Sequence, residues 1–329
     1  MHPSIRLAAA GAIVAALLGA CAGSVAVSPT PETAGASPLA SAGSACNTDA
    51  LPGWPAAGQV ATSGIIPVLA SSEKVVGKTR LVFSLIDQSN LPVASPDIHL
   101  QMAFFDLCAS ATTPTETLSP IFAWGIVGQR GFYIVTPTLT TAGTWGVAIV
   151  ATDASGKQTT ARMQFSVDQT GTTPAVGAAA PSVKTPTLAD VGGDVTKISS
   201  DPKPDPSFYT ESVDQALKAG EPFVLAFATP AFCKSAECGP TLDTVKAVVK
   251  ANPIRAINVE PYQLTWTNGR LQPVLANGDF VTVEATNAYG IPTEPWIFVV
   301  GASGKIVASF EAVVAPDELA AAIKAAKSG

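Results

Sequence analysis

The spacing of hydrophobic residues changes along the chain and separates two kinds of folded segment. Between residues 53 and 168, short apolar runs are bounded by Gly, Pro, Asn and Asp, and they lie at 80–86, 98–105, 131–135, 143–152 and 158–167. Runs of this length and composition predict β-strands, and the sequence Asp153-Ala-Ser-Gly156 predicts a hairpin turn between the last two. Because no helical periodicity interrupts the series, residues 53–168 predict an all-β sandwich.

From Ser207 onward the pattern alternates between apolar strands and amphipathic helices. Strands are predicted at 223–228, 254–259, 295–300 and 305–310, and helices at 210–219, 240–252 and 317–326. In the middle helix Leu242, Val245 and Val249 share one face, and Pro240 is expected at its first position. Residues 207–329 therefore predict an α/β domain.

Two segments lack such patterns. Residues 21–52 contain mainly Ala, Ser, Gly, Pro and Thr, and residues 169–206 are rich in Pro, Gly, Thr and Ala. Segments of this composition bury too little apolar surface to offset their ordering entropy. We interpret residues 21–52 as a flexible tether and residues 169–206 as an interdomain linker.

The first 20 residues predict export. Arg6 precedes an apolar run from Leu7 to Leu18, which is too short to span a bilayer core of about 30 Å. The sequence Leu18-Gly-Ala-Cys21 resembles the lipobox of bacterial lipoproteins, which implies a signal peptide over residues 1–20 and a lipid on Cys21. The alternative is an ordinary signal peptide that leaves Cys21 free. The expected location is the extracytoplasmic face of the cell membrane, held by a lipid anchor.

Composition excludes several functional classes. The 329 residues carry 25 acidic and 19 basic side chains, so the formal net charge is −6 and no basic run is present. A nucleic-acid partner is therefore excluded. Of the two histidines, His2 lies in the leader and only His99 remains, which argues against histidine-based zinc sites, catalytic triads and haem chemistry. We predict no metal site and no cofactor.

The β-rich segment resembles immunoglobulin-like and fibronectin-like domains in its layout. That resemblance brings no site residues with it. Cys46 precedes this segment and Cys108 follows one of its strands, so an oxidising compartment favours a structural disulfide between them. The alternative is two buried or unpaired thiols.

Two motifs of the C-terminal segment resemble the thioredoxin superfamily. The strand 223–228 leads into Thr229-Pro-Ala-Phe-Cys233-Lys-Ser-Ala-Glu-Cys238-Gly-Pro240. Further on, Tyr289-Gly-Ile-Pro-Thr-Glu-Pro295-Trp296 is similar to the superfamily's Tyr-Gly segment and cis-proline. The resemblance covers about residues 207–327. It implies a thioredoxin-like fold, a cis peptide bond before Pro295, and a substrate groove at Pro295 and Trp296 close to the cysteines.

The cysteine loop departs from the superfamily pattern. Four residues separate Cys233 from Cys238 instead of two, and Ala226 stands where thioredoxins keep a buried acid. The two cysteines can form a disulfide only if the loop is not helical, because residues five apart in a helix rise by about 7.5 Å. A helix N-terminus and the charge of Lys234 favour a thiolate at Cys233, whereas Glu237 opposes ionisation of Cys238. We predict Cys233 as the nucleophile and Cys238 as the resolving residue.

These observations favour a membrane-anchored thiol–disulfide oxidoreductase whose partners are the thiols and disulfides of exported proteins. The alternative is a noncatalytic binding or scaffold lipoprotein with a structural disulfide. The Cys-x4-Cys spacing also resembles atypical two-cysteine peroxiredoxins, but Pro230 occupies the position of their threonine. Copper-delivery proteins of thioredoxin-like fold add a histidine, and this domain has none. The insertion at residues 260–288 predicts an added hairpin beside the third strand.

Overall fold

The computed structural model describes residues 51–329, and all of them belong to one compact unit. The predicted signal peptide, the lipidation residue Cys21, most of the tether and Cys46 lie outside the described residues. Among the described helices, none combines the length and the apolar character needed to cross a membrane.

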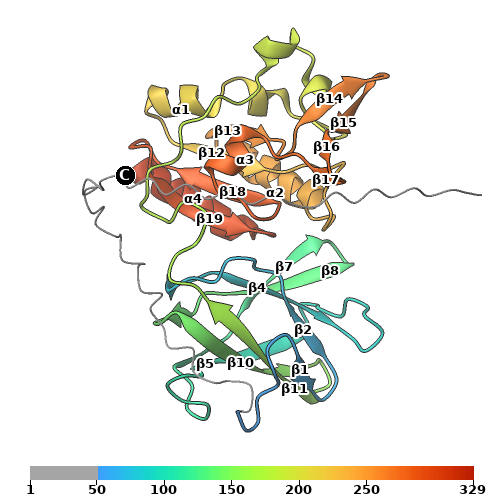
Figure 1. The fold of residues 1–329 in the computed structure, drawn as a ribbon, viewed down its shortest axis with the longest axis vertical. Coiled ribbons are helices and arrows are strands. Elements are labelled where there is room, and N and C mark those ends of the chain that lie inside the picture. The colour runs from blue at the N-terminus through green and yellow to red at the C-terminus, as the bar shows by residue number, and fades with distance from the viewer. Residues whose placement is uncertain (1–50) are drawn as a thin grey trace, which may run out of the picture. The chain divides into compact units, whose positions relative to one another are not determined.

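Two β-sheets form the N-terminal part (Figure 1). The five-stranded sheet has the order β1 (Val60–Thr62), β11 (Gln158–Val167), β10 (Gly143–Thr152), β5 (His99–Asp106) and β6 (Glu116–Leu118). The four-stranded sheet has the order β2 (Ile66–Leu69), β4 (Leu81–Ile86), β8 (Arg130–Val135) and β7 (Ile121–Ile126), and β3 (Gly77–Lys78) pairs with β9 (Thr138–Leu139). Phe83 and Tyr133 from one sheet share a core with Phe104 and Trp145 from the other. The two sheets therefore pack face to face.

The alternation of side chains explains why these strands form. In β5, His99 is exposed, Leu100 is buried, Gln101 is exposed and Met102 is buried. This period of two places one face against the core and the other in solvent. β10 and β11 have the predicted bounds and pair antiparallel through the predicted turn, where the Gly156 N–H donates to the Asp153 carbonyl at 2.9 Å.

A mixed four-stranded sheet organises the C-terminal part. Its order is β13 (Arg255–Val259), β12 (Phe223–Phe227), β18 (Trp296–Val300) and β19 (Ile306–Glu311). β12 runs parallel to β13 and antiparallel to β18, which continues antiparallel into β19. One face packs on α2 (Cys238–Ala251) and α4 (Pro316–Ser328), and the other face packs on α1 (Val213–Ala219) and α3 (Glu284–Ala288).

The insertion after β13 contains two short hairpins rather than the single one predicted. β14 (Leu264–Thr267) pairs with β15 (Arg270–Pro273), and β16 (Leu275–Ala276) pairs with β17 (Asp279–Phe280). Asn268 and Asn277, each followed by glycine, have positive φ angles of 54°. Asn-Gly pairs adopt this conformation readily, which explains the two tight turns.

Residues 169–206 were expected to be a linker, but they pack along the C-terminal part. They contain the 3₁₀ turns η1 (Leu188–Val191) and η2 (Val195–Lys197), and η3 (Pro206–Tyr209) follows at their end. Ala180 and Val183 are buried in the same cluster as β12, and Ala179 forms a β-bridge with Lys305. Residues 169–206 connect the two parts, and their scattered apolar residues also find a matching surface on the folded sheet.

The β-rich and α/β parts also share an apolar interface. One apolar cluster spans this interface. It joins Val82, Phe132 and Ile134, on the outer face of the β2–β4–β8–β7 sheet, to Val313 and Ala315 of the α/β part. At the edge of this cluster, Arg80 donates two hydrogen bonds of 2.9 Å to the Glu318 carboxylate. The two parts are therefore joined by packing as well as by chain connection.

Candidate functional site

A disulfide joins Cys233, in the loop between β12 and α2, to Cys238, the first residue of α2, and the two Cα atoms lie 5.9 Å apart. Residues 231–237 are not helical, which meets the condition that the sequence set for pairing. The helix begins at Cys238, however, and not at Pro240 as predicted. Proline is tolerated there because the first four N–H groups of a helix have no acceptor within it.

The two cysteines differ in accessibility. Cys238 is fully buried, whereas Cys233 is partly exposed. The Cys233 sulfur accepts a hydrogen bond from the Cys238 N–H at 3.3 Å, and the Ser235 hydroxyl lies 3.3 Å from it. Since the Cys238 N–H belongs to the first turn of α2, this contact would favour negative charge on Cys233. Cys233 is thus the sulfur that an external thiol can reach.

The β-rich part contacts the cysteine loop through Arg130. Its Nη1 donates to the Ser235 carbonyl at 2.6 Å and to Glu237 Oε1 at 2.8 Å. Glu237 is 3% exposed, and within the described part of the chain its Oε2 has no hydrogen-bond partner. Burial raises the pKa of Glu237 above its ordinary value, against the opposing effect of Arg130.

Glu237 is buried because the cysteine loop packs closely against the sheet formed by β2, β4, β8 and β7. A Cβ atom added at Gly125, in β7, would lie 2.2 Å from Glu237 Oε2. A larger residue at this position would collide with the carboxylate, so the glycine permits the loop to approach the sheet.

Lys234 lies next to Cys233 in the sequence, but its ammonium group is directed elsewhere. Its Nζ lies 5.7 Å from the centre of the Phe280 ring, in the insertion. Phe280 in turn contacts Phe232 and Tyr262, with ring centres 6.4 Å and 4.9 Å apart. The insertion therefore places the aromatic side chains of Phe280 and Tyr262 beside the cysteine loop.

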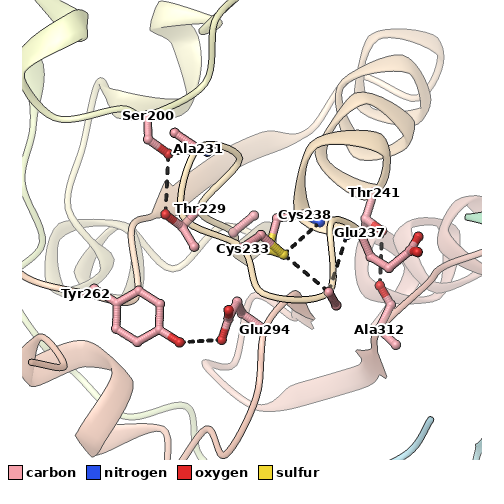
Figure 2. Close-up of a disulfide and its surroundings, with 12 residues drawn as sticks. Ser200, Thr229, Ala231, Cys233, Glu237, Cys238, Thr241, Tyr262, Glu294 and Ala312 are labelled. Carbon is pink, nitrogen blue, oxygen red and sulfur yellow. Dashed lines mark hydrogen bonds between the residues drawn. A yellow bond between two sulfur atoms is a disulfide. The ribbon is translucent and has the colours of Figure 1, made fainter. Parts of the chain in front are cut away.

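The Glu294–Pro295 peptide bond is cis, as the sequence predicted. The carboxylate of Glu294 approaches the disulfide, since one of its oxygens and both sulfur atoms all lie within 4.8 Å of one another. Figure 2 shows this carboxylate between the bridge and Tyr262, whose hydroxyl donates to Glu294 Oε2 at 2.6 Å. Burial and then the neighbouring Glu294 raise the pKa of Tyr262, so its hydroxyl remains a donor. Sequence reasoning did not identify either residue, although Glu294 stands in the quoted proline motif.

Trp296 does not lie on the side of the sheet that faces the cysteines. Its side chain is 4% exposed, clusters with Phe298 and Phe227, and donates from Nε1 to the Ser309 hydroxyl at 2.7 Å. Cys238 belongs to the cluster on the other face, together with Ile297. The expectation that Trp296 adjoins the cysteines was wrong because successive residues of a strand point to opposite faces.

A second buried acid, Glu260, follows β13. Its Oε1 accepts from the Ser200 N–H at 2.6 Å. Burial raises the pKa of Glu260 to about 7, against hydrogen bonds from Thr229 and Ser200. Glu260 and Tyr262 also line a cavity of about 330 Å³ next to the inserted hairpins. The sequence analysis did not identify Glu260, for which the available signal was an acid directly after a predicted strand.

The other predicted disulfide is only partly within the described residues. Cys108 is disulfide-bonded, and its predicted partner Cys46 lies outside them. The Cys46–Cys108 pairing therefore stays a prediction.

Comparisons with known proteins do not assign a family. No protein-family model and no curated protein matches this chain. A family 76 glycoside hydrolase from a bovine Bacteroides thetaiotaomicron strain shares 13% identity over 33% of this chain and 21% of its own, with a TM-score of 0.23. The PmoD soluble domain from Methylocystis sp. ATCC 49242 (Rockwell) shares 16% identity over 31% of this chain and 90% of its own, with a TM-score of 0.19. Similarities at these TM-scores carry no argument about function.

Proposed function

We propose that this protein is a membrane-anchored extracytoplasmic thiol–disulfide oxidoreductase that acts on exported proteins. In this proposal residues 207–329 form a thioredoxin-like domain and residues 53–168 an immunoglobulin-like sandwich. The observation that carries the proposal is the Cys233–Cys238 disulfide, with one partly exposed and one buried sulfur. An exchanging pair needs one sulfur open to a partner and one held for resolution.

The exchange proceeds through a mixed disulfide. A thiolate of the partner attacks Cys233 Sγ, the Cys233–Cys238 bond breaks, and Cys238 leaves as a thiolate. A second partner thiolate then attacks the partner sulfur bound to Cys233 and releases the Cys233 thiolate. The partner gains a disulfide and loses two electrons to the cysteine pair, and the reverse sequence reduces a partner disulfide.

A noncatalytic scaffold with a structural disulfide is the second candidate. The observation that favours it is the attachment of the loop by Arg130, which holds Ser235 and Glu237 from outside the α/β part. A loop held in this way would resist the movement that exchange requires.

The reduction potential of the Cys233/Cys238 pair distinguishes the two candidates. A working pair should have a potential above about −300 mV, and a structural bridge should lie below it. In addition, the Cys238→Ser variant should accumulate mixed disulfides with a disulfide-containing model protein, because the Cys233 thiolate attacks that disulfide, one sulfur leaves as a thiolate, and no Cys238 thiol is present to release the product. The Cys233→Ser variant is the matched control, because its remaining sulfur is buried. A potential below about −300 mV together with equal trapping by both variants would reject the oxidoreductase.

The proposed membrane anchor has its own test. Cys21→Ala should release the protein from the membrane or block maturation, because the lipid would have no attachment site. Membrane fractionation and labelling with a tagged fatty acid measure both effects. A variant that stays membrane-bound and labelled like the parent would contradict lipidation at Cys21.

A further inference from the structure

The Cys233–Cys238 pair has a third potential ligand beside it. One carboxylate oxygen of Glu294 and the two sulfur atoms lie within 4.8 Å of one another. These groups come from separate segments, since Cys233 lies in the loop before α2, Cys238 is the first residue of α2, and Glu294 precedes β18. Tertiary folding therefore brings the Glu294 oxygen close to two sulfurs, although Glu294 lies 56 residues or more after both cysteines in the sequence.

The spacing suits a tetrahedral cation once the disulfide is reduced. Zinc binds thiolate sulfur at about 2.3 Å and carboxylate oxygen at about 2.0 to 2.2 Å, so the ligand atoms around it lie about 3.5 to 3.8 Å apart. Such separations fall within the 4.8 Å that encloses the three atoms. The Cys-x4-Cys spacing also lies within the range that zinc sites use.

The surroundings would hold the carboxylate in position. The Tyr262 hydroxyl donates to Glu294 Oε2 at 2.6 Å, which orients the carboxylate (Figure 2). Hydrogen bonds of this kind fix metal-binding carboxylates, and their loss typically weakens metal binding by about 10 to 100-fold. Cys238 is buried, while Cys233 and Glu294 are partly exposed, so a cation and a fourth ligand from solvent can enter.

We propose that the reduced Cys233/Cys238 pair and Glu294 form a binding site for Zn²⁺. Two thiolates with one carboxylate suit a borderline divalent cation better than Cu⁺, which prefers sulfur ligands alone. The prediction of no metal site rested on the scarcity of histidine and did not consider Glu294.

Binding depends on the redox state of the pair. A dithiol reductant supplies two electrons and two protons to convert the disulfide into two thiols, and it is itself oxidised to a disulfide. Zn²⁺ then replaces both thiol protons, forms two Zn–S bonds and releases two protons. Bound Zn²⁺ would keep the sulfurs from exchange. The inference uses the reducibility of the pair from the proposed function, but it does not require that the pair act on protein partners.

The experiment compares Zn²⁺ binding by the oxidised and reduced protein, using competition with a chromophoric zinc chelator. The reduced protein should bind one more Zn²⁺ per chain than the oxidised protein, and Cys233→Ser should lose this additional binding. Co²⁺ in place of Zn²⁺ should give the thiolate-to-metal absorption of a tetrahedral site only in the reduced form.

Three further variants locate the site. Glu294→Gln should weaken Zn²⁺ binding at least about 10-fold, and Tyr262→Phe should weaken it by about 10-fold. Glu284→Gln is the matched control, because Glu284 is exposed and belongs to α3. Equal binding by oxidised and reduced protein, a pair that cannot be reduced in the folded chain, or unchanged affinity in Glu294→Gln would each overturn the proposal. Zinc binding without exchange activity would instead reject the oxidoreductase and leave the zinc site in place.

Discussion

At the scale of single residues, burial changes the ionisation of two acids, Glu237 and Glu260. β12 carries no acid, and its Ala226 is buried in the hydrophobic cluster that includes residues of α2 and α4. Glu237 and Glu260 are buried instead, one in the cysteine loop and one after β13. Each carboxylate has one oxygen that, within residues 51–329, lacks a hydrogen-bond partner. Burial therefore favours the protonated form of both acids.

Glu260 predicts a pH dependence of stability. Its pKa is raised to about 7 in the folded protein, from an ordinary value of 4.5. Between these values the folded state retains a proton that the unfolded state has lost, so stability is highest at low pH and falls as pH rises to about 7. This difference between the two pKa values corresponds to about 3 kcal/mol in the free energy of unfolding. Glu260→Gln, which is always neutral, should remove this decrease.

Urea unfolding at pH 4.5, 6 and 7.5 measures the effect on the free energy of unfolding. The wild-type protein should lose about 3 kcal/mol more than Glu260→Gln across this interval. Glu284→Gln serves as control and should follow the wild-type profile, since the side chain of Glu284 is exposed. Parallel profiles for wild type and Glu260→Gln would show that the burial of Glu260 has no such consequence.

At the scale of elements, the ends of strands and helices decide which side chains meet. β5 ends at Asp106, whose carboxylate accepts hydrogen bonds from the N–H groups of Cys108 and Ala109 at 3.0 and 3.2 Å. These bonds close a turn that holds Cys108 directly after the strand. On the α/β side, the start of α2 at Cys238 places one sulfur inside the helix and leaves the other in the loop.

The turn after β5 bears on the predicted Cys46–Cys108 bridge. Cys108 is disulfide-bonded, and Cys46 is the predicted partner. Nonreducing peptide mapping of the protein should therefore recover linked peptides that contain Cys46 and Cys108, separate from those of Cys233 and Cys238. Recovery of Cys46 as an alkylated thiol in freshly isolated protein would show that the pairing is wrong.

At the scale of the whole molecule, the β-rich part belongs to the surroundings of the cysteine loop. Arg130 reaches Ser235 and Glu237, and Gly125 lets the β7 backbone pack on the Glu237 carboxylate. Further from the loop, Arg80 donates to Glu318 and to the Val313 carbonyl. These contacts couple the position of the loop to the attachment of the β sheets.

Removal of Arg130 should expose this coupling. Arg130→Ala leaves the buried Glu237 carboxylate without its cation, so the free energy of unfolding should fall by about 1–3 kcal/mol. The double variant Arg130→Ala/Glu237→Gln should recover part of that loss, because the neutral amide costs less to bury. Denaturant unfolding of the four proteins in this mutant cycle measures the coupling energy.

Arg80→Ala provides the comparison for that cycle. It removes an interface cation whose partners are Glu311, Val313 and Glu318 rather than residues of the cysteine loop, so Glu237→Gln should not compensate for it. Additive effects of Arg130→Ala and Glu237→Gln, with no recovery in the double variant, would mean that the ion pair does not stabilise the loop.

Local pattern was sufficient for much of the secondary structure. The strands β10 and β11 have the predicted bounds, and those of the α/β part lie within one residue of them. Alternating or continuous apolar residues and strong turn residues determine such elements without reference to distant parts of the chain. Short strands such as β1 and β6, and the second inserted hairpin, were not predicted because their few residues acquire a strand conformation by pairing with neighbours.

The sequence alone determined the two kinds of folded segment and the bounds of β10 and β11, since each depends on residues close together in the chain. The tertiary structure decided that Trp296 faces away from the cysteines, that residues 169–206 pack on the sheet, and that Arg130, Tyr262 and Glu294 converge on the loop. Those outcomes depend on which strand face meets which helix and on contacts between residues up to about a hundred positions apart, and no local pattern records such contacts.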